Sequence, residues 1–139
     1  MNGYVTGGPK SLLRFEGLAV LATSVFAYSH FAMEGLGGWG GFALLFLAPD
    51  LSMLGYLGGR KAGAAAYNAA HSYVLPLGLL VFGLAMAMPA AVSLALIWTA
   101  HIGFDRLLGY GLKYGEGFGF THLGRVGKAK AGKTQEIAA

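Results

Sequence analysis

Four long apolar runs, separated by short polar connections, form the hydrophobic pattern of the chain. A helix that crosses a bilayer needs about 20 largely apolar residues, and each run is close to that length. Pro89 opens the fourth run, and proline is favoured in the first turn of a helix. Short connections place consecutive helices antiparallel. The pattern therefore predicts an all-α, integral membrane, up-down four-helix bundle with spans over residues 11–33, 41–58, 62–88 and 89–110.

The composition is that of a membrane protein. Hydrophobic residues make up 55% of the 139 residues and charged residues 12%. An ordinary soluble domain carries about 25% charged residues. The length fits a single domain, residues 1–139. The chain has no cysteine, which excludes disulfides, thiolate metal ligands and cysteine nucleophiles.

Lysine and arginine flank the predicted spans on one side only. They precede the first span, fill the second connection and follow the fourth span, at Lys10, Arg14, Arg60, Lys61, Lys113 and Arg125. Because cytoplasmic flanks carry the excess of basic residues, we expect a multi-pass protein of the bacterial inner membrane with both termini cytoplasmic. Glu16 and Arg14 interrupt the first apolar run, which argues against a cleaved signal peptide. Residues 125–139 are predicted to be a basic flexible tail that contacts anionic headgroups rather than nucleic acid.

Polar side chains interrupt the spans at a shared depth. Counted at about 1.5 Å per residue from the cytoplasmic ends, they lie roughly 8 to 15 Å inside the membrane. Four helices contribute to this polar layer, which consists of Glu16, Asp50, Asn68, His71, His101 and Asp105. His101 and Asp105 are four residues apart, and Asn68 and His71 are three apart, so each pair shares a helix face. Ionisable groups at membrane depth usually mark a site or a pathway.

Two prolines lie in the same part of the spans. Pro49 directly precedes Asp50, and Pro76 follows His71. A proline removes a backbone donor, so a helix broken at either position leaves carbonyl groups without a helical partner. In a membrane, such carbonyls are tolerated only against protein or a water-filled cavity. The prolines therefore predict helix breaks close to the polar layer.

The side chains of the polar layer suit a metal site. Two neutral imidazoles and one carboxylate form a common catalytic ligand set for zinc or iron. The predicted ligands are the three that lie at the most similar depth, His71, His101 and Asp50. Asp105 or Glu16 is the predicted proton-handling group or additional ligand, and Arg106 is predicted to bind an anionic group of the substrate. A metal-free network of paired charges and a proton or ion pathway remain alternatives.

Glycine alternates with aromatic residues after the fourth span, in the sequence GYGLKYGEGFGF. Glycine permits tight bends, and the aromatic side chains require an apolar surface. This cytoplasmic segment is predicted to fold under the mouth of the site as a short lid and to return Thr121 and His122 towards the polar layer. Asn68, Tyr67, Tyr110 and His122 are predicted to support the site or its lid.

Several stretches of the sequence resemble a known family of bacterial membrane proteins, the domain of unknown function 4260 family. The similar stretches are PDLSMLGYLGG, AYNAAHSYVLP, HIGFDRLLGYGLKY and FTHLG, and the resemblance runs from about Leu12 to Gly124. It implies an integral membrane protein whose signature polar residues correspond to Asp50, Asn68, His71, His101, Asp105, Arg106 and His122. It implies no activity, because that family has no agreed one. The metal is inferred from depth and spacing alone.

The polar layer and its apolar surroundings together suggest a function. We expect metal-dependent chemistry, either hydrolysis or oxidation, on a lipid or small amphiphilic substrate. Two other functions stay open at this point. One is a proton- or ion-coupled carrier, which four helices would form as a homo-oligomer. The other is a non-catalytic accessory or binding subunit of a membrane complex.

Overall fold

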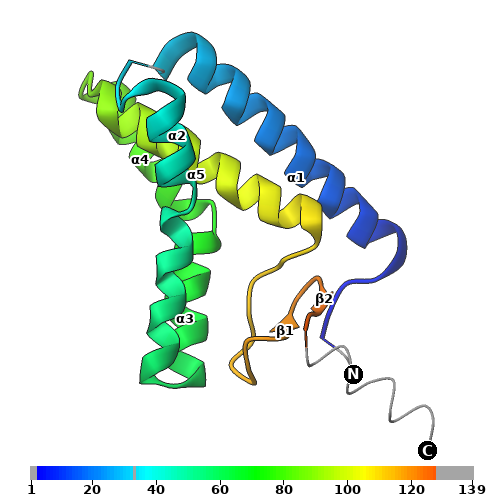
Figure 1. Ribbon diagram of the computed structural model, residues 1–139. Coiled ribbons are helices and arrows are strands. Elements are labelled where there is room, and N and C mark those ends of the chain that lie inside the picture. Colours follow the sequence, from blue (N-terminus) through cyan, green and yellow to red (C-terminus); the bar gives the residue numbers. More distant parts are fainter. Residues whose placement is uncertain (1–2, 33, 128–139) are drawn as a thin grey trace, which may run out of the picture.

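The computed structural model describes residues 3–32 and 34–127 and is mostly helical (Figure 1). The helical elements are α1 (Gly7–Ala27), the π-helical turn η1 (Tyr28–Ala32), α2 (Gly38–Phe46), the 3₁₀ helix η2 (Ala48–Gly58), α3 (Arg60–His71), α4 (Val74–Ala85) and α5 (Pro89–Leu108). A small antiparallel sheet follows, made by β1 (Phe120–Thr121) and β2 (Gly124–Arg125). Most of the tail predicted to be flexible, residues 128–139, lies outside the described residues.

Four helical stretches are long and apolar enough to cross a membrane, Gly7–Ala32, Gly38–Gly58, Arg60–Ala85 and Pro89–Leu108. They contain 26, 21, 26 and 20 residues, and about 20 are enough for a bilayer. The helical fold class and the four spanning helices predicted from the apolar runs are thus confirmed. The fourth stretch ends at Leu108 rather than Tyr110, because Gly109 has φ 91 and closes the helix in the left-handed conformation.

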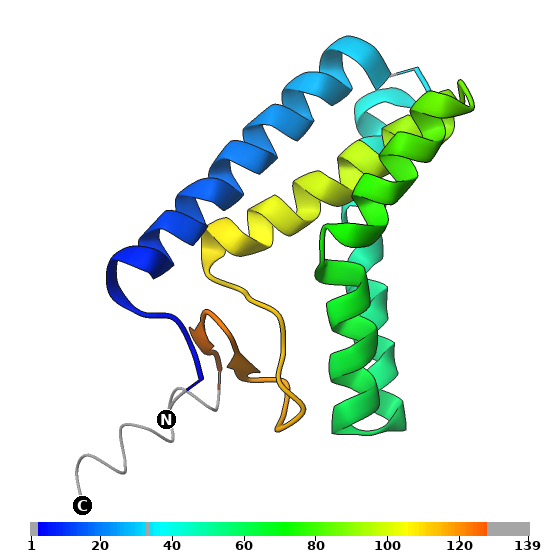
Figure 2. The same ribbon diagram turned by 180° about the vertical axis from the view of Figure 1, so that it is seen from behind.

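The helices pack as two pairs. α1 lies along α5, and η2 lies along α3, while α4 and α2 also contact α5. α5 is the most buried of the four spanning stretches, so it is the centre of the molecule. The two pairs diverge towards the end where the small sheet lies, which is visible from both sides (Figures 1 and 2). The four helices predicted from the sequence are therefore present, and their arrangement is that of two diverging pairs.

Glycines set the closest approaches within both pairs. A Cβ atom at Gly17 would lie 2.7 Å from the carbonyl oxygen of Gly103, and one at Gly103 would lie 2.8 Å from that of Gly17. In the second pair, a Cβ atom at Gly55 would lie 2.6 Å from the Cβ of Ala66. Non-bonded heavy atoms pack best at about 3.5–4.0 Å, so a side chain at these positions would force the helices apart. Small residues are what lets helix backbones approach this closely in a membrane.

The second and third spanning stretches each contain a helix break beside the residues of the polar layer. α2 gives way to 3₁₀ geometry after Phe46, and Pro49 lies in the first turn of η2. α3 ends at His71, Ser72 is extended with φ −96 and ψ 151, and Pro76 lies in the first turn of α4. η2 has 11 residues, although 3₁₀ runs longer than about 3–4 residues are uncommon. The helix breaks predicted from the two prolines are present.

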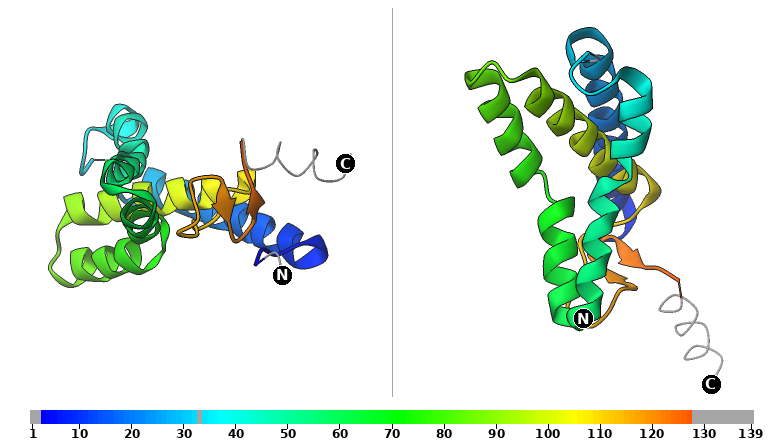
Figure 3. Two further views of the ribbon diagram at one scale, coloured as in Figure 1. Left: turned by 90° about the horizontal axis from the view of Figure 1, so that it is seen from below. Right: turned by 60° about the vertical axis from the view of Figure 1, so that its left-hand side comes forward.

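The segment after α5 lies between the diverging ends of the two pairs (Figure 3). The turn between β1 and β2 accepts a hydrogen bond at the His122 carbonyl from the Val5 amide, 2.7 Å long, which joins the segment to the start of the chain. Its tip accepts one at the Glu116 carbonyl from the Arg60 guanidinium, 3.3 Å long, which joins it to the start of α3. The segment therefore bridges the two helix pairs.

Replacing Gly103 by alanine tests the contact between α1 and α5. We expect Gly103→Ala to lower the free energy of unfolding by about 1–3 kcal/mol, because the new Cβ meets backbone atoms that cannot rotate away. Gly78→Ala in α4 is the matched control, since its Cβ would have nothing within 4 Å. The control is expected to leave stability unchanged or slightly higher. Unfolding by SDS in mixed micelles, followed by circular dichroism, measures both, and equal stability of the two variants would contradict the packing.

Candidate metal centre

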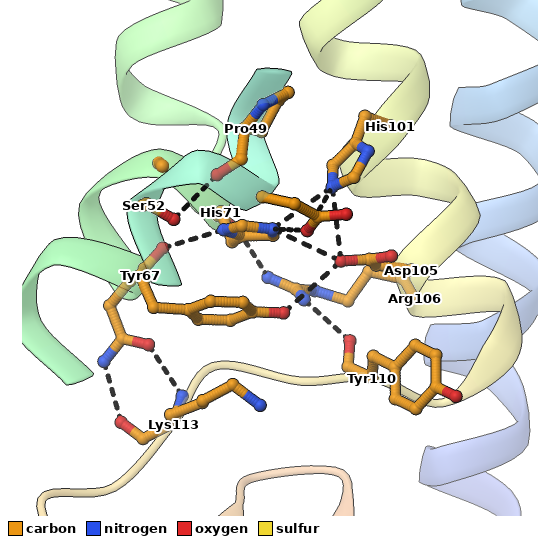
Figure 4. A network of polar contacts seen from close by, with 12 residues as sticks. Pro49, Ser52, Tyr67, His71, His101, Asp105, Arg106, Tyr110 and Lys113 are labelled. Carbon is orange, nitrogen blue, oxygen red and sulfur yellow. Dashed lines mark hydrogen bonds and ion pairs between the residues drawn. The ribbon is translucent and has the colours of Figure 1, made fainter. Parts of the chain in front are cut away.

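Four side chains with metal-ligating atoms converge from three elements (Figure 4). Asp50 comes from the first turn of η2, His71 is the last residue of α3, and His101 and Asp105 lie one turn apart on α5. Their ligand atoms all lie within 4.8 Å of one another. His71, His101 and Asp105 are buried, and the side chain of Asp50 is 38% exposed. The fold thus brings the three predicted ligands and Asp105 to one point.

Five of the six separations among the four atoms are close to the edges of a tetrahedral metal site, and all six are within 4.8 Å. Nε2 of His71 lies 3.2 Å from Nε2 of His101, 3.3 Å from Oδ1 of Asp50 and 3.4 Å from Oδ2 of Asp105. Nε2 of His101 lies 3.3 Å and 3.6 Å from the same two oxygens. Nitrogen and oxygen ligands at about 2.0–2.1 Å from a zinc ion form a tetrahedron with edges of about 3.3–3.4 Å. Five of the six edges are close to that length.

Direct hydrogen bonding accounts for these distances less well. A charge-assisted hydrogen bond between a protonated nitrogen and a carboxylate is about 2.7–2.9 Å long. None of the four distances between the histidines and the aspartates is shorter than 3.3 Å. The two imidazole nitrogens also face each other, and only one of them can donate to the other. A single cation at the centre would satisfy all four atoms at once, so these four residues could hold a metal ion.

The orientation of His71 leaves its Nε2 free to bind a metal. Its Nδ1 lies 2.9 Å from the carbonyl oxygen of Tyr67, to which it donates the imidazole proton. That hydrogen bond places the lone pair on Nε2, as is usual for metal-ligating histidines. The Tyr67 ring stacks on the His71 ring, with centroids 3.7 Å apart and an interplanar angle of 8°. The Tyr67 hydroxyl donates to Oδ2 of Asp105 over 3.3 Å, so Tyr67 supports one imidazole and one carboxylate together.

His101 is held differently. It is 2% exposed, and its ring meets the edge of Phe46 at a centroid distance of 5.2 Å. Its Nδ1 has no hydrogen-bond partner among residues 3–32 and 34–127. Leaving a buried polar group unsatisfied costs about 1–3 kcal/mol, and such groups tend to mark functional positions. Packing against Phe46, rather than a hydrogen bond, therefore aims Nε2 of His101 at the other ligands.

α5 caps the carbonyl groups that the break after α3 leaves without helical partners. Arg106 donates from Nη2 to the carbonyl oxygen of His71 over 2.7 Å and from Nη1 to that of Tyr110 over 2.9 Å. Trp98 donates from Nε1 to the carbonyl oxygen of Ala70 over 2.6 Å. The same helix that supplies His101 and Asp105 thus also fixes the end of α3 that carries His71.

Two residues predicted to act in catalysis lie outside the group of four. Glu16 is exposed on α1, and Arg106 donates to the carbonyls of His71 and Tyr110 and supplies no ligand atom. Both line a separate cavity of about 360 Å³, together with Tyr73 and His122. The rotation of α1 directs the Glu16 side chain away from the group of four and towards this second cavity.

Lys113 also lies at the site, although the sequence pattern indicated it only as a basic residue that flanks the fourth span. The Asn68 side chain forms two hydrogen bonds with the Lys113 backbone. Its Nδ2 donates to the Lys113 carbonyl over 2.8 Å, and its Oδ1 accepts from the Lys113 backbone N–H over 2.6 Å. The side chain of Lys113 is buried below the Tyr67 ring, with Nζ 4.5 Å from its centroid. Burial lowers the pKa of Lys113, while the nearby Asp105 and Asp50 carboxylates act in the opposite direction. No spacing rule along the chain would have revealed this position.

A cavity of about 840 Å³ opens beside the ligands. Both carboxylates, Asp50 and Asp105, line it, and the two histidines do not, so the cavity reaches the site from its carboxylate side. Its other polar lining comes from Tyr67, Tyr110 and Lys113, and its apolar lining includes Met53, Phe118, Phe120 and Val126. The segment after α5 therefore forms one wall of the cavity.

The amino-acid sequence identifies the family. The model of a protein family described as a domain of unknown function, DUF4260, matches residues 10–126. The chain belongs to this family. The matched stretch includes all four converging residues and confirms the resemblance seen in the sequence. The comparisons with curated proteins and with solved structures found no match to the chain.

His122 fastens the segment after α5 in a way that depends on its protonation. Its Nδ1 accepts a hydrogen bond from the Leu112 amide over 2.8 Å, and its amide donates to the Leu112 carbonyl over 3.0 Å. The first of these requires a neutral Nδ1. Burial, and next the positive charge of Arg106, lower the pKa of His122 below its ordinary 6.5.

A pH titration tests this contact. Because the pKa of His122 is lower in the folded protein, the stabilisation is complete above about pH 6.5 and is lost as the pH falls towards the folded value. We expect the protection of the Leu112 amide from hydrogen exchange, corrected for intrinsic exchange, to decrease below about pH 6.5. His122→Asn offers a non-titrating acceptor and should keep its protection constant. A wild-type protein with protection unchanged down to pH 5 would contradict the assignment.

Proposed function

We propose that this chain is an integral membrane enzyme that uses a metal ion, held by His71, His101, Asp50 and Asp105, to act on an amphiphilic substrate. The observation that carries the proposal is the tetrahedral spacing of four ligand atoms at the wall of a large cavity. A catalytic zinc site keeps one coordination position for water or substrate, so one of the four residues would have to leave that position free. Here the cavity leads to both carboxylates, so a substrate has access to the site.

The ligand chemistry favours zinc. Zinc accepts imidazole nitrogen and carboxylate oxygen in a tetrahedral arrangement, whereas iron sites with two histidines and one carboxylate keep further open positions. A bound zinc ion would polarise a carbonyl or phosphoryl oxygen of the substrate and activate a water molecule for attack. Hydrolysis of an ester or phosphoester is therefore the reaction class that we propose.

The residues of the chain take distinct roles in this scheme. Asp50 is the most exposed of the four ligands, so it is the one that can yield its position to water or substrate. Oδ2 of Asp105 accepts a hydrogen bond from the Tyr67 hydroxyl, so Tyr67 would orient this carboxylate at the centre. His71 is fixed by its bond to the Tyr67 carbonyl and keeps its ligand atom in place. Arg106 acts as a positioning residue through the carbonyls of His71 and Tyr110.

The proposed location follows from charge. The basic residues that flank the spans lie at the starts of α1 and α3 and in the segment after α5, which are joined to one another by hydrogen bonds. Basic flanks are retained on the cytoplasmic side. We therefore propose four alternating crossings of a bacterial inner membrane, with both termini and the cavity facing the cytoplasm.

Metal analysis tests the centre. Protein purified in mild detergent without a histidine tag is expected to hold about one zinc ion per chain, as a single tetrahedral site would. The double variant His71→Ala, His101→Ala should lose the metal. His30→Ala is the matched control, because His30 is a partly exposed histidine of η1 and contacts Ser29 and Phe26 instead. Mass spectrometry gives the metal content, and circular dichroism shows whether the variants are folded.

The same preparations test the reaction. Zinc-loaded protein in vesicles is expected to cleave a fluorogenic dodecanoate ester or dodecyl phosphodiester, with at least about a hundredfold lower rate in the double variant. Zinc bound without turnover of either substrate would defeat the proposed hydrolysis and leave a metal-binding protein. A folded wild type without metal would defeat the proposal as a whole. Proton flux in liposomes would then be measured, with Asp50→Asn and Asp105→Asn as the decisive variants.

A further inference from the structure

We propose that Lys113 binds the anionic head of the substrate, and that the substrate is a single-chain amphiphile with a phosphate or carboxylate group. This inference rests on the proposed function, since it names the substrate class for the same cavity. It adds a binding residue from the segment after α5, which holds none of the metal ligands.

The position of Lys113 is fixed by its backbone. Asn68 pairs with both its carbonyl and its amide, and Lys113 forms an isolated antiparallel bridge with Thr121. A lysine that merely sat at the membrane surface would need no such support. The flexible part of the residue is its side chain, and that side chain is directed inward, leaving Lys113 only 5% exposed.

The ammonium group of Lys113 lacks an anionic partner. It donates one hydrogen bond to the Phe118 carbonyl, 3.0 Å long, and lies 3.7 Å from the centroid of the Phe118 ring and 4.5 Å from that of Tyr67. Within the part of the chain that the structure describes, no carboxylate lies within ion-pair distance of it. A buried ammonium has three donors and is costly without a counter-ion. The remaining donors are therefore available to a ligand in the cavity.

The surroundings select an amphiphile. The cavity joins Lys113 to Asp50 and Asp105, so one ligand can contact both the ammonium group and the proposed centre. The Tyr67 ring lies between His71 and Lys113, so one aromatic ring separates the imidazole from the ammonium group (Figure 4). The apolar lining, which includes Met53, Phe118, Phe120 and Val126, suits an acyl or alkyl chain. The volume of about 840 Å³ is within the usual range of ligand sites.

The other buried cation near the centre is already satisfied. Arg106 donates to two carbonyl groups, and it lines the separate cavity rather than this one. Lys113 is thus the buried cation of the described chain that faces the ligand cavity and lacks an anion.

Calorimetric binding of dodecyl phosphate tests the inference. The protein is placed in zwitterionic lipid nanodiscs and measured both zinc-loaded and stripped by a chelator, with empty nanodiscs subtracted. Lys113→Met is expected to raise the dissociation constant at least about tenfold, because it removes a charged hydrogen-bond donor. Lys113→Arg keeps the charge, and Lys61→Met removes an exposed lysine outside the cavity. Both should stay within about threefold of the wild type.

Dodecanol and inorganic phosphate distinguish the parts of the ligand. Dodecanol should bind equally to the wild type and Lys113→Met, and inorganic phosphate should bind far more weakly than dodecyl phosphate. Unchanged binding of dodecyl phosphate by folded Lys113→Met overturns the inference. So does a loss of affinity for dodecanol as large as the loss for dodecyl phosphate. Equal affinity for inorganic phosphate overturns the assignment of an amphiphile. Should Lys113→Met not fold, the charge-retaining Lys113→Arg is compared with Lys113→Gln in the same way.

The two proposals fail separately. Binding that depends on Lys113 in metal-stripped protein, together with no metal in the purified protein, sinks the metal centre alone. A bound metal with binding that ignores Lys113 sinks this inference alone.

Discussion

The convergence of two carboxylates and two imidazoles among apolar helices is the constraint on which the structure depends. Removing such groups from water is expensive, and bringing two carboxylates together adds repulsion unless a cation balances them. The cluster therefore needs four atoms held at the right spacing around one centre. α5 supplies two of them from adjacent turns, and η2 and α3 supply one each. The second helix pair must consequently be held in register against α5.

The helix breaks meet this need. An unbroken α3–α4 helix would not end at His71. The carbonyls freed by the break would be costly if no group donated hydrogen bonds to them. Arg106 and Trp98 donate to two of these carbonyls from α5. The break after α3 and the groups that cap it thus act together, and α5 positions His71 as well as its own His101 and Asp105. The long 3₁₀ helix η2 places Asp50 opposite it.

The segment after α5 turns this centre into a site with a defined entrance. Its backbone is fastened to α3 through Asn68 and to the start of the chain through His122. It thereby forms one wall of a cavity lined by two carboxylates, a buried ammonium group and apolar side chains. The ammonium group suits the anionic head of a ligand, and the apolar lining suits its apolar body. The bilayer around the four helices is a natural source of such molecules.

The sequence by itself determined the helical class, the four spans and the shared depth of the polar residues, because apolar length and a rise of about 1.5 Å per residue are properties of the chain alone. It also indicated the breaks at Pro49 and Pro76, since a missing backbone donor acts locally. Tertiary structure decided which residues at that depth meet. Glu16 has the right depth but the wrong rotation about the axis of α1, and Arg106 turns to the carbonyls of a neighbouring helix. Lys113 enters the cavity only because Asn68, 45 residues earlier, holds its backbone. Rotation and long-range backbone pairing are set by packing between helices, which no local pattern encodes.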